Sequence, residues 1–382
     1  MLKLAVAVGG TDLGRSGIGA YVRAILPRLS ARLADSGGRL FALGTARDLA
    51  VYRDALDDAE RLEIHGLWES PAASALWHLV AAGSAAARAG AEVLLLPAAN
   101  RRAAIRSPIP TVAVVHDVAQ LHVRGKYDRL RVAYVRRLVL QALAAADELI
   151  AVSEATRVDT ARALARPPDR LRLVPNGVDH ERFTPPREGD PRVRAARFRT
   201  GLDGPYLLYP ARLEHPGKNH LRLLQAFLAS RASRSHVLAL AGADWGALPR
   251  IRAEIARLGL EDRVAWLGYV PEELLPGLVA GADAVAMVGL REGFGLPALE
   301  ALAAGRSLVI AAAGALPEVA GELAARCDPL DVGSIAAALD RALEDGALRE
   351  RARREGPERA RARSWDVTVG GLLEACRAAR RR

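Results

Sequence analysis

Short apolar runs bounded by Gly, Pro or Asp recur along the chain, and longer amphipathic stretches separate them. Strand-length apolar runs that alternate with helix-length stretches are typical of β-α-β units, whose parallel strands are buried on both faces. The pattern therefore predicts an α/β protein with two doubly wound parallel sheets. In the first half, strands are predicted at Leu2–Val8, Val93–Leu96, Thr111–Val115, Glu148–Val152 and Arg172–Val174. In the second half, they are predicted at Tyr206–Tyr209, His236–Leu240, Val264–Leu267, Ala284–Val288 and Ser307–Ile310.

The length of the chain and one polar segment predict where the domains divide. With 382 residues, the chain exceeds the size at which a single hydrophobic core usually stops growing. Residues 179–205 contain four prolines, several glycines and mixed charge, which is typical of a connection between domains. We expect an N-terminal domain at 1–180, a connection at 181–204, a C-terminal domain at 205–360 and a terminal helical segment at 361–382.

Composition favours a globular protein in a reducing compartment. Apolar residues make up 51% of the chain and charged residues 26%, which is enough apolar surface for a substantial core. The opening run Leu2–Val8 lacks the features of a signal peptide, and no stretch has the length of about 20 apolar residues that a spanning helix needs. The two cysteines, Cys327 and Cys376, form no metal or redox spacing. A cytoplasmic location is expected.

The net charge of +10 favours anionic partners. The cations are spread as Arg along many amphipathic helices, and five Phe are too few for an aromatic platform that binds single strands, so no nucleic-acid partner is expected. Residues Arg124–Arg137 place cations beside apolar residues at near-helical spacing. This segment is either a membrane-surface helix or a plain solvated helix. We accordingly expect a cytoplasmic protein, with peripheral contact to the inner face of the membrane if the first interpretation holds.

Two motifs in the first half follow predicted strands. Gly14-Arg-Ser-Gly17-Ile-Gly19-Ala-Tyr21 follows the first strand and leads into a helix predicted at Tyr21–Leu33. Its glycines permit a phosphate to approach a helix N-terminus, but a tight strand-to-helix turn explains them equally well. His116-Asp117 directly follows the strand Thr111–Val115, at the sheet edge where α/β proteins bind ligands. His116 is either part of such a site or a structural histidine.

The stretch Arg212-Leu-Glu-His-Pro-Gly-Lys218-Asn219 carries two cations in a loop after a predicted strand. Arg and Lys in one loop can converge on a diphosphate. The alternative is two solvated surface cations. Composition argues against that alternative at Lys218, because the chain contains only two other lysines, Lys3 and Lys126, and uses Arg for nearly all its cations.

The stretch Glu292-Gly293-Phe294-Gly295-Leu-Pro-Ala-Leu299-Glu300 follows the apolar run Ala284–Val288. It places Glu292 in a loop at the sheet's carboxyl edge and Glu300 about one turn into the next helix. Glycines leave backbone amides accessible to a ligand. Two carboxylates in this arrangement suit the recognition of hydroxyl groups better than paired acid/base hydrolysis.

With these motifs, the sequence resembles the retaining nucleotide-sugar glycosyltransferases of family 4, also called glycosyltransferase group 1. The resemblance covers most of the chain and implies the GT-B fold, in which two Rossmann-like domains face each other. The motifs occur in one order along the chain: Gly17–Tyr21, Val115–Asp117, Val152–Glu154, Val174–Asp179, Arg212–Asn219, Gly268–Pro271, Glu292–Glu300 and Leu316–Gly321.

The resemblance implies a role for each site residue. It assigns Arg212 and Lys218 to the donor diphosphate, Glu300 to the ribose, Glu292 to the sugar hydroxyls and His116 to a position against the sugar. The remaining donor-binding residues are Gly17 and Gly19 near the diphosphate, Gly268, Tyr269 and Val270 near the base, amides at Gly293, Phe294 and Gly295, and Leu299. It also implies that the N-terminal domain binds the acceptor and that the last helix returns to it, with Trp365 near the crossing.

The chain departs from the family pattern at two places. Val288-Gly289 replaces a common Pro-Ser before the first glutamate, and His215–Gly217 replaces the usual loop before the lysine. The charged positions are retained. No metal-ligand spacing is present, so we expect no metal and no cofactor, with cations and backbone amides neutralising the leaving diphosphate.

The expected activity is transfer of a hexose, with GDP-mannose as the leading donor, to a glycan, lipid-linked or natural-product acceptor. The resemblance implies retention of the anomeric configuration. A sugar-nucleotide epimerase or hydrolase on the same fold is one alternative, since a fold does not fix a reaction. A catalytically silent regulator that binds nucleotide sugars is the other.

Overall fold

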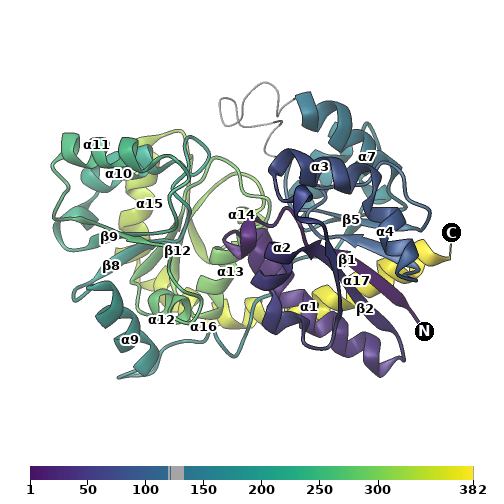
Figure 1. The fold of residues 1–382 in the computed structure, drawn as a ribbon. Coiled ribbons are helices and arrows are strands. Elements are labelled where there is room, and N and C mark those ends of the chain that lie inside the picture. The colour runs from purple at the N-terminus through teal and green to yellow at the C-terminus, as the bar shows by residue number, and fades with distance from the viewer. Residues whose placement is uncertain (119–120, 122–132, 382) are drawn as a thin grey trace. The chain divides into compact units, whose positions relative to one another are not determined.

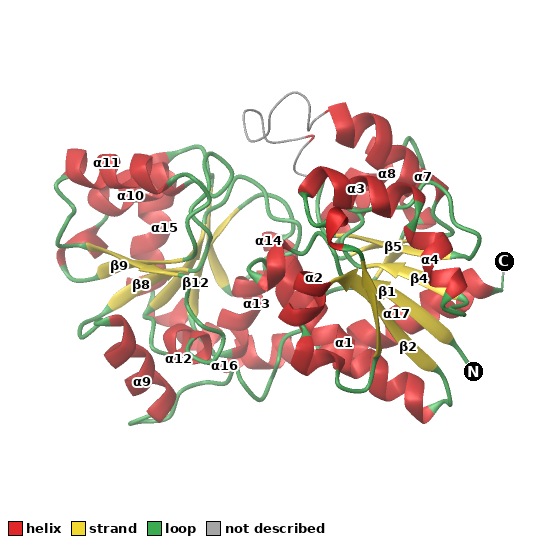
Figure 2. Cartoon of the chain, in the orientation of Figure 1, coloured by secondary structure: helices red, strands yellow, loops and turns green. Residues whose placement is uncertain are grey.

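The computed structural model describes residues 1–118, 121 and 133–381, so most of the basic segment Arg124–Arg137 lies outside the described residues. The chain divides into two compact units (Figure 1). The first unit comprises Met1–Gly177 and Trp365–Arg382, and the second comprises Val178–Ser364. Each unit is a parallel sheet with helices on both of its faces (Figure 2). Two doubly wound sheets were predicted, and the structure confirms them.

The first unit contains a seven-stranded sheet in the order β3-β2-β1-β4-β5-β6-β7. Its strands pair in parallel throughout. They are β1 (Lys3–Ala7), β2 (Arg39–Thr45), β3 (Glu60–Ile64), β4 (Val93–Leu96), β5 (Thr111–Val115), β6 (Glu148–Ala151) and β7 (Arg172–Leu173). The central strands β4 and β5 are buried at every position, as a sheet covered on both faces requires.

Helices of the first unit form two layers. One layer contains α1 (Gly17–Asp35) and α17 (Trp365–Arg380), which pack against each other. The other contains α3 (Pro71–Val80), α4 (Ala82–Arg88), the π-helix η4 (Val135–Val139), α7 (Leu140–Ala145) and α8 (Glu154–Ala163), whose apolar residues share one core. The short α2 (Ala46–Val51) follows β2. The last helix is held in this unit by Thr368, whose hydroxyl donates to the Pro175 carbonyl at 2.8 Å, and by Trp365, whose ring meets Tyr21 at 5.8 Å.

The second unit contains a six-stranded parallel sheet in the order β10-β9-β8-β11-β12-β13. Its strands are β8 (Tyr206–Tyr209), β9 (Val237–Ala241), β10 (Val264–Gly268), β11 (Ala284–Met287), β12 (Ser307–Ala311) and β13 (Ala324–Cys327). The layer of α10 (His220–Ala229), α11 (Leu248–Leu258) and α15 (Val332–Glu344) shares a core on one face. The other face carries α9 (Pro191–Thr200), α12 (Leu275–Ala280), α13 (Leu296–Ala303), α14 (Leu316–Ala320) and α16 (Gly346–Arg361).

The expected connection at 181–204 belongs to the second unit, where it contains α9 rather than a linker. Asp190 caps the helix by accepting from the Arg192 amide at 2.8 Å, and Pro191 occupies the first turn. A Cβ on Gly277 would meet the Arg192 carbonyl oxygen at 2.1 Å, so α9 packs tightly against α12. Proline and aspartate interrupt strands, but they are also favourable at the start of a helix. For this reason, the composition of this segment suggested a linker although the segment contains α9.

All ten predicted strands are present, but the sequence analysis missed β2, β3 and β13. β3 is an edge strand with three charged residues, and β13 is short and rich in alanine. β2 had a usable signal, because its buried run Leu40–Leu43 follows Gly37-Gly38. In the described part of the chain, no helix has both the length and the apolar character needed to span a membrane.

Candidate functional site

The predicted site residues of the second unit lie in loops that follow neighbouring strands. The sheet order places β10, β9, β8 and β11 side by side, and parallel strands end at the same edge. Arg212 and Lys218 lie in the loop of residues 210–219 between β8 and α10, which we call the basic loop. Glu292 lies between β11 and α13, and Glu300 lies inside α13. The sequence placed these residues correctly along the chain.

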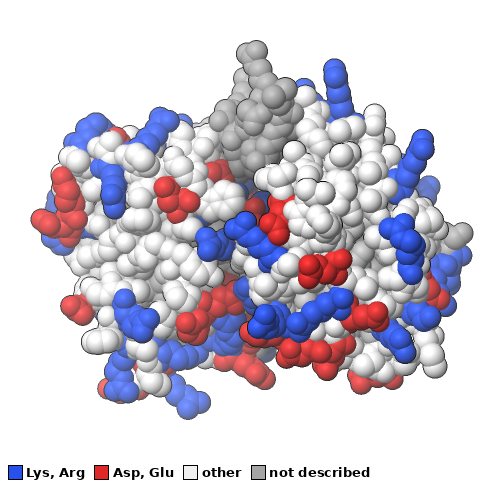
Figure 3. Space-filling model, in the orientation of Figure 1, with Lys and Arg blue, Asp and Glu red and all other residues white. Residues whose placement is uncertain are grey.

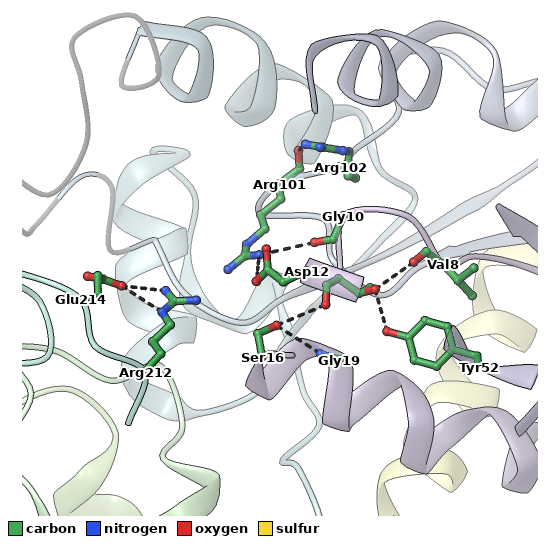
Figure 4. A network of polar contacts seen from close by, with 11 residues as sticks. Val8, Gly10, Asp12, Ser16, Gly19, Tyr52, Arg101, Arg102, Arg212 and Glu214 are labelled. Carbon is green, nitrogen blue, oxygen red and sulfur yellow. Dashed lines mark hydrogen bonds and ion pairs between the residues drawn. The ribbon is translucent and has the colours of Figure 1, made fainter. Parts of the chain in front are cut away.

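Arg212 is held on its edge and on its face by groups that the sequence analysis did not identify. Its Nε and Nη2 atoms donate to Glu214 Oε2 at 3.1 and 2.8 Å, as drawn in Figure 4. Its guanidinium carbon lies 4.5 Å from the centre of the Trp245 ring, within the range of a cation–π interaction. Trp245 is held there because its amide donates to the Leu213 carbonyl at 2.9 Å, which joins the basic loop to the loop after β9.

Lys218 and Glu292 form an ion pair between the basic loop and the loop after β11. The Lys218 ammonium donates to Glu292 Oε1 at 2.7 Å and to Oε2 at 3.0 Å. Their side chains are only 18% and 12% exposed, so solvent screens the pair little. The sequence analysis assigned both residues to one ligand, and the structure brings them into direct contact. No sequence signal predicted that contact, because 74 residues separate them.

The glycine at position 289 has a steric explanation. A Cβ there would lie 2.7 Å from Glu292 Oε1 and 3.4 Å from the Gly217 carbonyl oxygen. Any side chain there would therefore require the Glu292 carboxylate to shift from its position in the ion pair. The departure of Val288-Gly289 from the family pattern thus leaves room for the Glu292 carboxylate in its observed position.

The N-terminus of α13 presents backbone amides without a side-chain cap. Gly295 occupies the capping position with φ of 90° and, as a glycine, has no side chain with which to cap the helix. A helix start of this kind is favourable for an anion. Phe294 and Leu299 are buried, so we infer that they support the loop and the helix by packing.

Glu300 lies in a partly desolvated position. Burial raises the pKa of its carboxyl to about 7, with Arg182 lowering it and Glu272 raising it. A carboxyl with such a pKa changes charge near neutral pH.

The predicted base-binding stretch begins at Gly268, at the end of β10. Gly268 has φ of 68°, and Tyr269 is 49% exposed. Val270 follows directly after Tyr269.

His116 of the first unit follows β5 and is buried, with 8% of its surface exposed. Its Nε2 lies 2.8 Å from the Pro97 carbonyl oxygen, which can only accept, so Nε2 carries the proton. Its ring meets the Tyr21 ring edge-on at 4.7 Å. Burial lowers the pKa of His116 to about 4, so the ring is neutral at physiological pH. These contacts give His116 a structural role in addition to the one predicted for it.

The turn before α1 is held by polar contacts to the backbone, which Figure 4 shows from close by. The Ser16 hydroxyl accepts from the Gly19 amide at 3.4 Å and caps α1, which begins at Gly17. A Cβ on Gly19 would lie 2.5 Å from the Gly14 Cα, so close packing already requires glycine at position 19. The structure thus supplies the tight-turn explanation, and the phosphate role of Gly17 and Gly19 stays a prediction.

Asp12 and Arg101 form an ion pair next to this turn, which the sequence analysis missed. Figure 4 shows Asp12 with the guanidinium of Arg101, whose Nη1 also lies 3.5 Å from the Gly10 carbonyl oxygen.

On the face shown in Figure 3, cationic and anionic side chains are interspersed over both units. Among the described residues, no three His, Cys, Asp or Glu side chains group as metal ligands would.

Two sequence profiles cover most of the chain. The profile described as Glycosyltransferase Family 4 matches residues 17–182, and the profile described as Glycosyl transferases group 1 matches residues 194–359. The two matches fall in the first and the second unit respectively, apart from a few residues at the boundary.

Curated relatives with named activities align with parts of the chain. O-antigen chain mannosyltransferase B of Escherichia coli is 30% identical over 266 residues, which cover 69% of each chain. MMP alpha-(1->4)-mannosyltransferase of Mycolicibacterium hassiacum is 36% identical over 52% of this chain and 45% of that protein. Mannosylfructose-phosphate synthase of Agrobacterium fabrum is 30% identical over 53% of this chain and 46% of that protein. The chain thus aligns with about half the length of the last two.

Solved structures share the fold over nearly the whole chain. Anabaena HepE, solved in complex with UDP and glucose, superposes with a TM-score of 0.77 at 17% identity, covering 98% of this chain and 99% of that chain. Sucrose-phosphate synthase from Thermosynechococcus elongatus superposes with a TM-score of 0.77 at 20% identity, covering 99% and 98%. These superpositions and the two parallel sheets confirm the predicted GT-B fold.

Proposed function

Because the chain belongs to glycosyltransferase family 4, we propose that it transfers a hexose from a nucleoside diphosphate sugar and that the second unit holds this donor. The observation that carries the proposal is the arrangement at one sheet edge of the second unit. There, the cations Arg212 and Lys218 lie in the basic loop, and Lys218 contacts Glu292 in the loop after β11. α13, whose capping residue is Gly295, follows Glu292.

In this proposal, Arg212 and Lys218 bind the donor's diphosphate. Both cations are paired with carboxylates in the structure. An ammonium has three N–H donors, so Lys218 can keep Glu292 and still donate to a phosphate oxygen. The face of Arg212 rests on Trp245, which leaves the guanidinium fixed in orientation before the ligand arrives.

The two carboxylates recognise hydroxyl groups of the same donor. Glu292, aligned by Lys218, accepts from hydroxyls of the sugar, while amides of Gly293, Phe294 and Gly295 face the phosphate or the sugar. Glu300 accepts from the ribose, and the turn Gly268–Val270 passes the base. The roles of His116, Gly17 and Gly19 remain predictions of the family resemblance.

We propose a transfer that retains the anomeric configuration. The bond between the anomeric carbon and the phosphate oxygen breaks, and the acceptor oxygen bonds to that carbon from the same face. The acceptor's proton moves to the departing phosphate oxygen, which leaves as nucleoside diphosphate. Arg212, Lys218 and backbone amides stabilise the developing charge, so the proposal requires neither a metal nor a cofactor.

GDP-mannose is the proposed donor. Its support comes from relatives that are named as mannosyltransferases or as a mannosylfructose-phosphate synthase. The proposed acceptor is a glycan, a lipid-linked sugar or a small natural product. Arg136 and Arg137, at the described end of the basic segment, are exposed, as is Leu138 directly after it, which supports peripheral contact with an anionic membrane.

The experiment that tests the proposal incubates the protein with GDP-mannose, UDP-glucose and other nucleotide sugars, with and without a panel of acceptors. We expect acceptor-dependent release of nucleoside diphosphate together with a glycosylated product. Release without acceptor would indicate a hydrolase, and an isomerised nucleotide sugar would indicate an epimerase. Binding without turnover over the whole panel would indicate a silent regulator. A stereochemical analysis of the product then tests retention.

A further inference from the structure

Asn219 closes the basic loop in an unusual backbone conformation. Its φ is 58°, in the left-handed region, which asparagine tolerates better than most residues other than glycine. It is 3% exposed and directly precedes α10. Asparagine at this position normally accepts from the first amides of the helix, but here the side chain makes no such cap. Its amide group therefore serves another purpose.

The side-chain amide of Asn219 joins three loops at the edge of the sheet. Nδ2 donates to the Val288 carbonyl at 3.0 Å and to the Pro329 carbonyl at 2.6 Å. Oδ1 accepts from Arg222 Nη1 at 3.0 Å, which fixes the orientation of the amide because Arg can only donate. Val288 follows β11 and Pro329 follows β13, so one buried side chain ties the basic loop to both.

The residues on either side of Lys218 are hydrogen-bonded to the segment between β11 and Glu292. On one side of it, the Gly217 carbonyl accepts from the Leu290 amide at 2.9 Å. On the other side, Asn219 binds the Val288 carbonyl. The Lys218 carbonyl itself accepts from the Tyr209 hydroxyl. These contacts fix the backbone of Lys218 at the distance that its ion pair with Glu292 requires.

We propose that Asn219 is a positioning residue for Lys218, with no contact to the donor of its own. The inference rests on the proposed function, in which Lys218 binds the donor's diphosphate. Two carbonyls require a donor of two hydrogens, and the left-handed backbone requires a residue that tolerates it. Asparagine meets both requirements, whereas glycine meets only the second and aspartate loses the donors.

The test compares binding of a nucleoside diphosphate with binding of the same nucleoside, using calorimetry. The probe is whichever of GDP, UDP and ADP stabilises the wild-type protein most in a thermal-shift assay. Asn219→Gly keeps the backbone conformation and removes the tie, while Asn219→Asp is nearly isosteric and places oxygen against two carbonyls. We expect each to reduce the preference for the diphosphate by about 10- to 100-fold, the scale of a small misplacement of a binding group.

A double-mutant cycle with Lys218→Ala separates positioning from general stability. If Asn219 acts through Lys218, the Asn219→Gly substitution adds no further loss once Lys218 is alanine. Phe227→Leu, a core substitution in the same helix α10, is the matched control. It should lower the melting temperature and leave the preference for the diphosphate unchanged.

The outcomes separate this inference from the proposed function. If Lys218→Ala alone leaves the preference for the diphosphate intact, the proposed role of Lys218 is wrong, and the role of Asn219 falls with it. If Lys218→Ala abolishes the preference but Asn219→Gly and Asn219→Asp retain it, only the positioning role is wrong. An equal loss from Asn219→Gly with lysine or alanine at position 218 would also overturn it.

Discussion

The carboxyl edges of the two sheets hold their polar side chains in different ways. In the second unit, polar side chains pair with each other. Lys218 and Glu292 form an ion pair between two loops, and Arg212 and Glu214 form one within a single loop. In the first unit, two buried polar groups bind backbone carbonyls, and an ion pair between Asp12 and Arg101 adjoins one of them, Thr11. His116 binds the Pro97 carbonyl at 2.8 Å, and Thr11 donates to the Val8 carbonyl at 3.1 Å.

The difference indicates what each edge can do. A side-chain ion pair can open or share its donors with an anionic ligand while the backbone keeps its hydrogen bonds. A side chain that satisfies a buried carbonyl cannot turn to a ligand without leaving that carbonyl unpaired, at a cost of about 1–3 kcal/mol. We therefore expect substitutions of Lys218 and Glu292 to act mainly on ligand binding and substitution of His116 to act mainly on folding.

Lys218→Ala should give the largest effect. We expect the transfer rate at saturating donor to fall about 10²- to 10³-fold, the scale seen when one preorganised donor to an anion is removed. Lys218→Arg should recover part of the rate, because a planar guanidinium does not fit the position of a compact ammonium. Steady-state kinetics measure both.

Folding must be controlled in the Lys218 experiment, since the alanine variant leaves Glu292 without its cation in a poorly solvated position. Circular dichroism provides that control. Near wild-type turnover in the alanine variant would remove Lys218 from the diphosphate site. Full activity in the arginine variant alone would contradict only the requirement for a compact ammonium.

His116→Ala tests the contrasting edge. Loss of a buried ring and of its bond to the Pro97 carbonyl should lower the free energy of unfolding of the first unit by about 2–3 kcal/mol. Affinity for nucleoside diphosphate should not change, because that ligand lacks the sugar. Denaturant titration and calorimetry measure the two quantities. An unchanged unfolding free energy would break the comparison between the edges.

His116 also gives the first unit a dependence on acid. Because its pKa is lowered to about 4 in the folded protein, the unfolded chain, with a histidine pKa of about 6.5, binds the proton more readily. Stability of the first unit should therefore fall as the pH decreases from about 6.5 toward 4. The slope should be smaller in His116→Ala.

Glu300 should give a smaller, pH-dependent effect on binding in the second unit. Its raised pKa of about 7 means that the carboxylate that accepts from ribose becomes populated only as the pH rises through neutrality. Nucleoside affinity should increase about tenfold between about pH 6 and 8 in the wild type and stay constant in Glu300→Gln. Calorimetry with the nucleoside avoids titration of phosphate. Parallel pH profiles for the two proteins would exclude Glu300 from the ribose site.

Binding to lipid should show the smallest effect for each residue. If the basic segment rests on a membrane, the exposed Arg136 and Arg137 each contribute about 1 kcal/mol with anionic vesicles, less with added salt. Co-sedimentation of the wild type and of an Arg136→Ala/Arg137→Ala variant measures this. Equal binding of both proteins, or binding to neutral vesicles, would contradict a membrane face at this end of the segment.

The positions of the predicted site residues relative to the strands could be read from the sequence for a physical reason, while their roles stay predictions. The sequence showed which strand precedes each charged site residue of the second unit, and parallel strands end at one edge of a sheet. These residues are Arg212, Lys218, Glu292 and Glu300. The contact between Lys218 and Glu292 could not be placed, because it depends on strand order and on the absence of a side chain at Gly289.

At the first edge, periodicity could show that His116 follows a strand but not which carbonyl it binds. Pro97 reaches it only because β4 and β5 are neighbours in the sheet. Trp245 was missed because its importance comes from backbone pairing between the loops after β8 and β9. Contacts between loops that are distant in sequence therefore could not be predicted, because the local pattern of residues carries no information on which strands are neighbours.

The most direct test of the central claim measures binding of GDP or UDP, and of the corresponding nucleoside, to the wild type and to Arg212→Ala/Lys218→Ala. The account predicts that the double substitution removes the preference for diphosphate over nucleoside while nucleoside affinity is retained. A double variant that is folded and still prefers the diphosphate to the wild-type extent would contradict the assignment of the diphosphate to this edge.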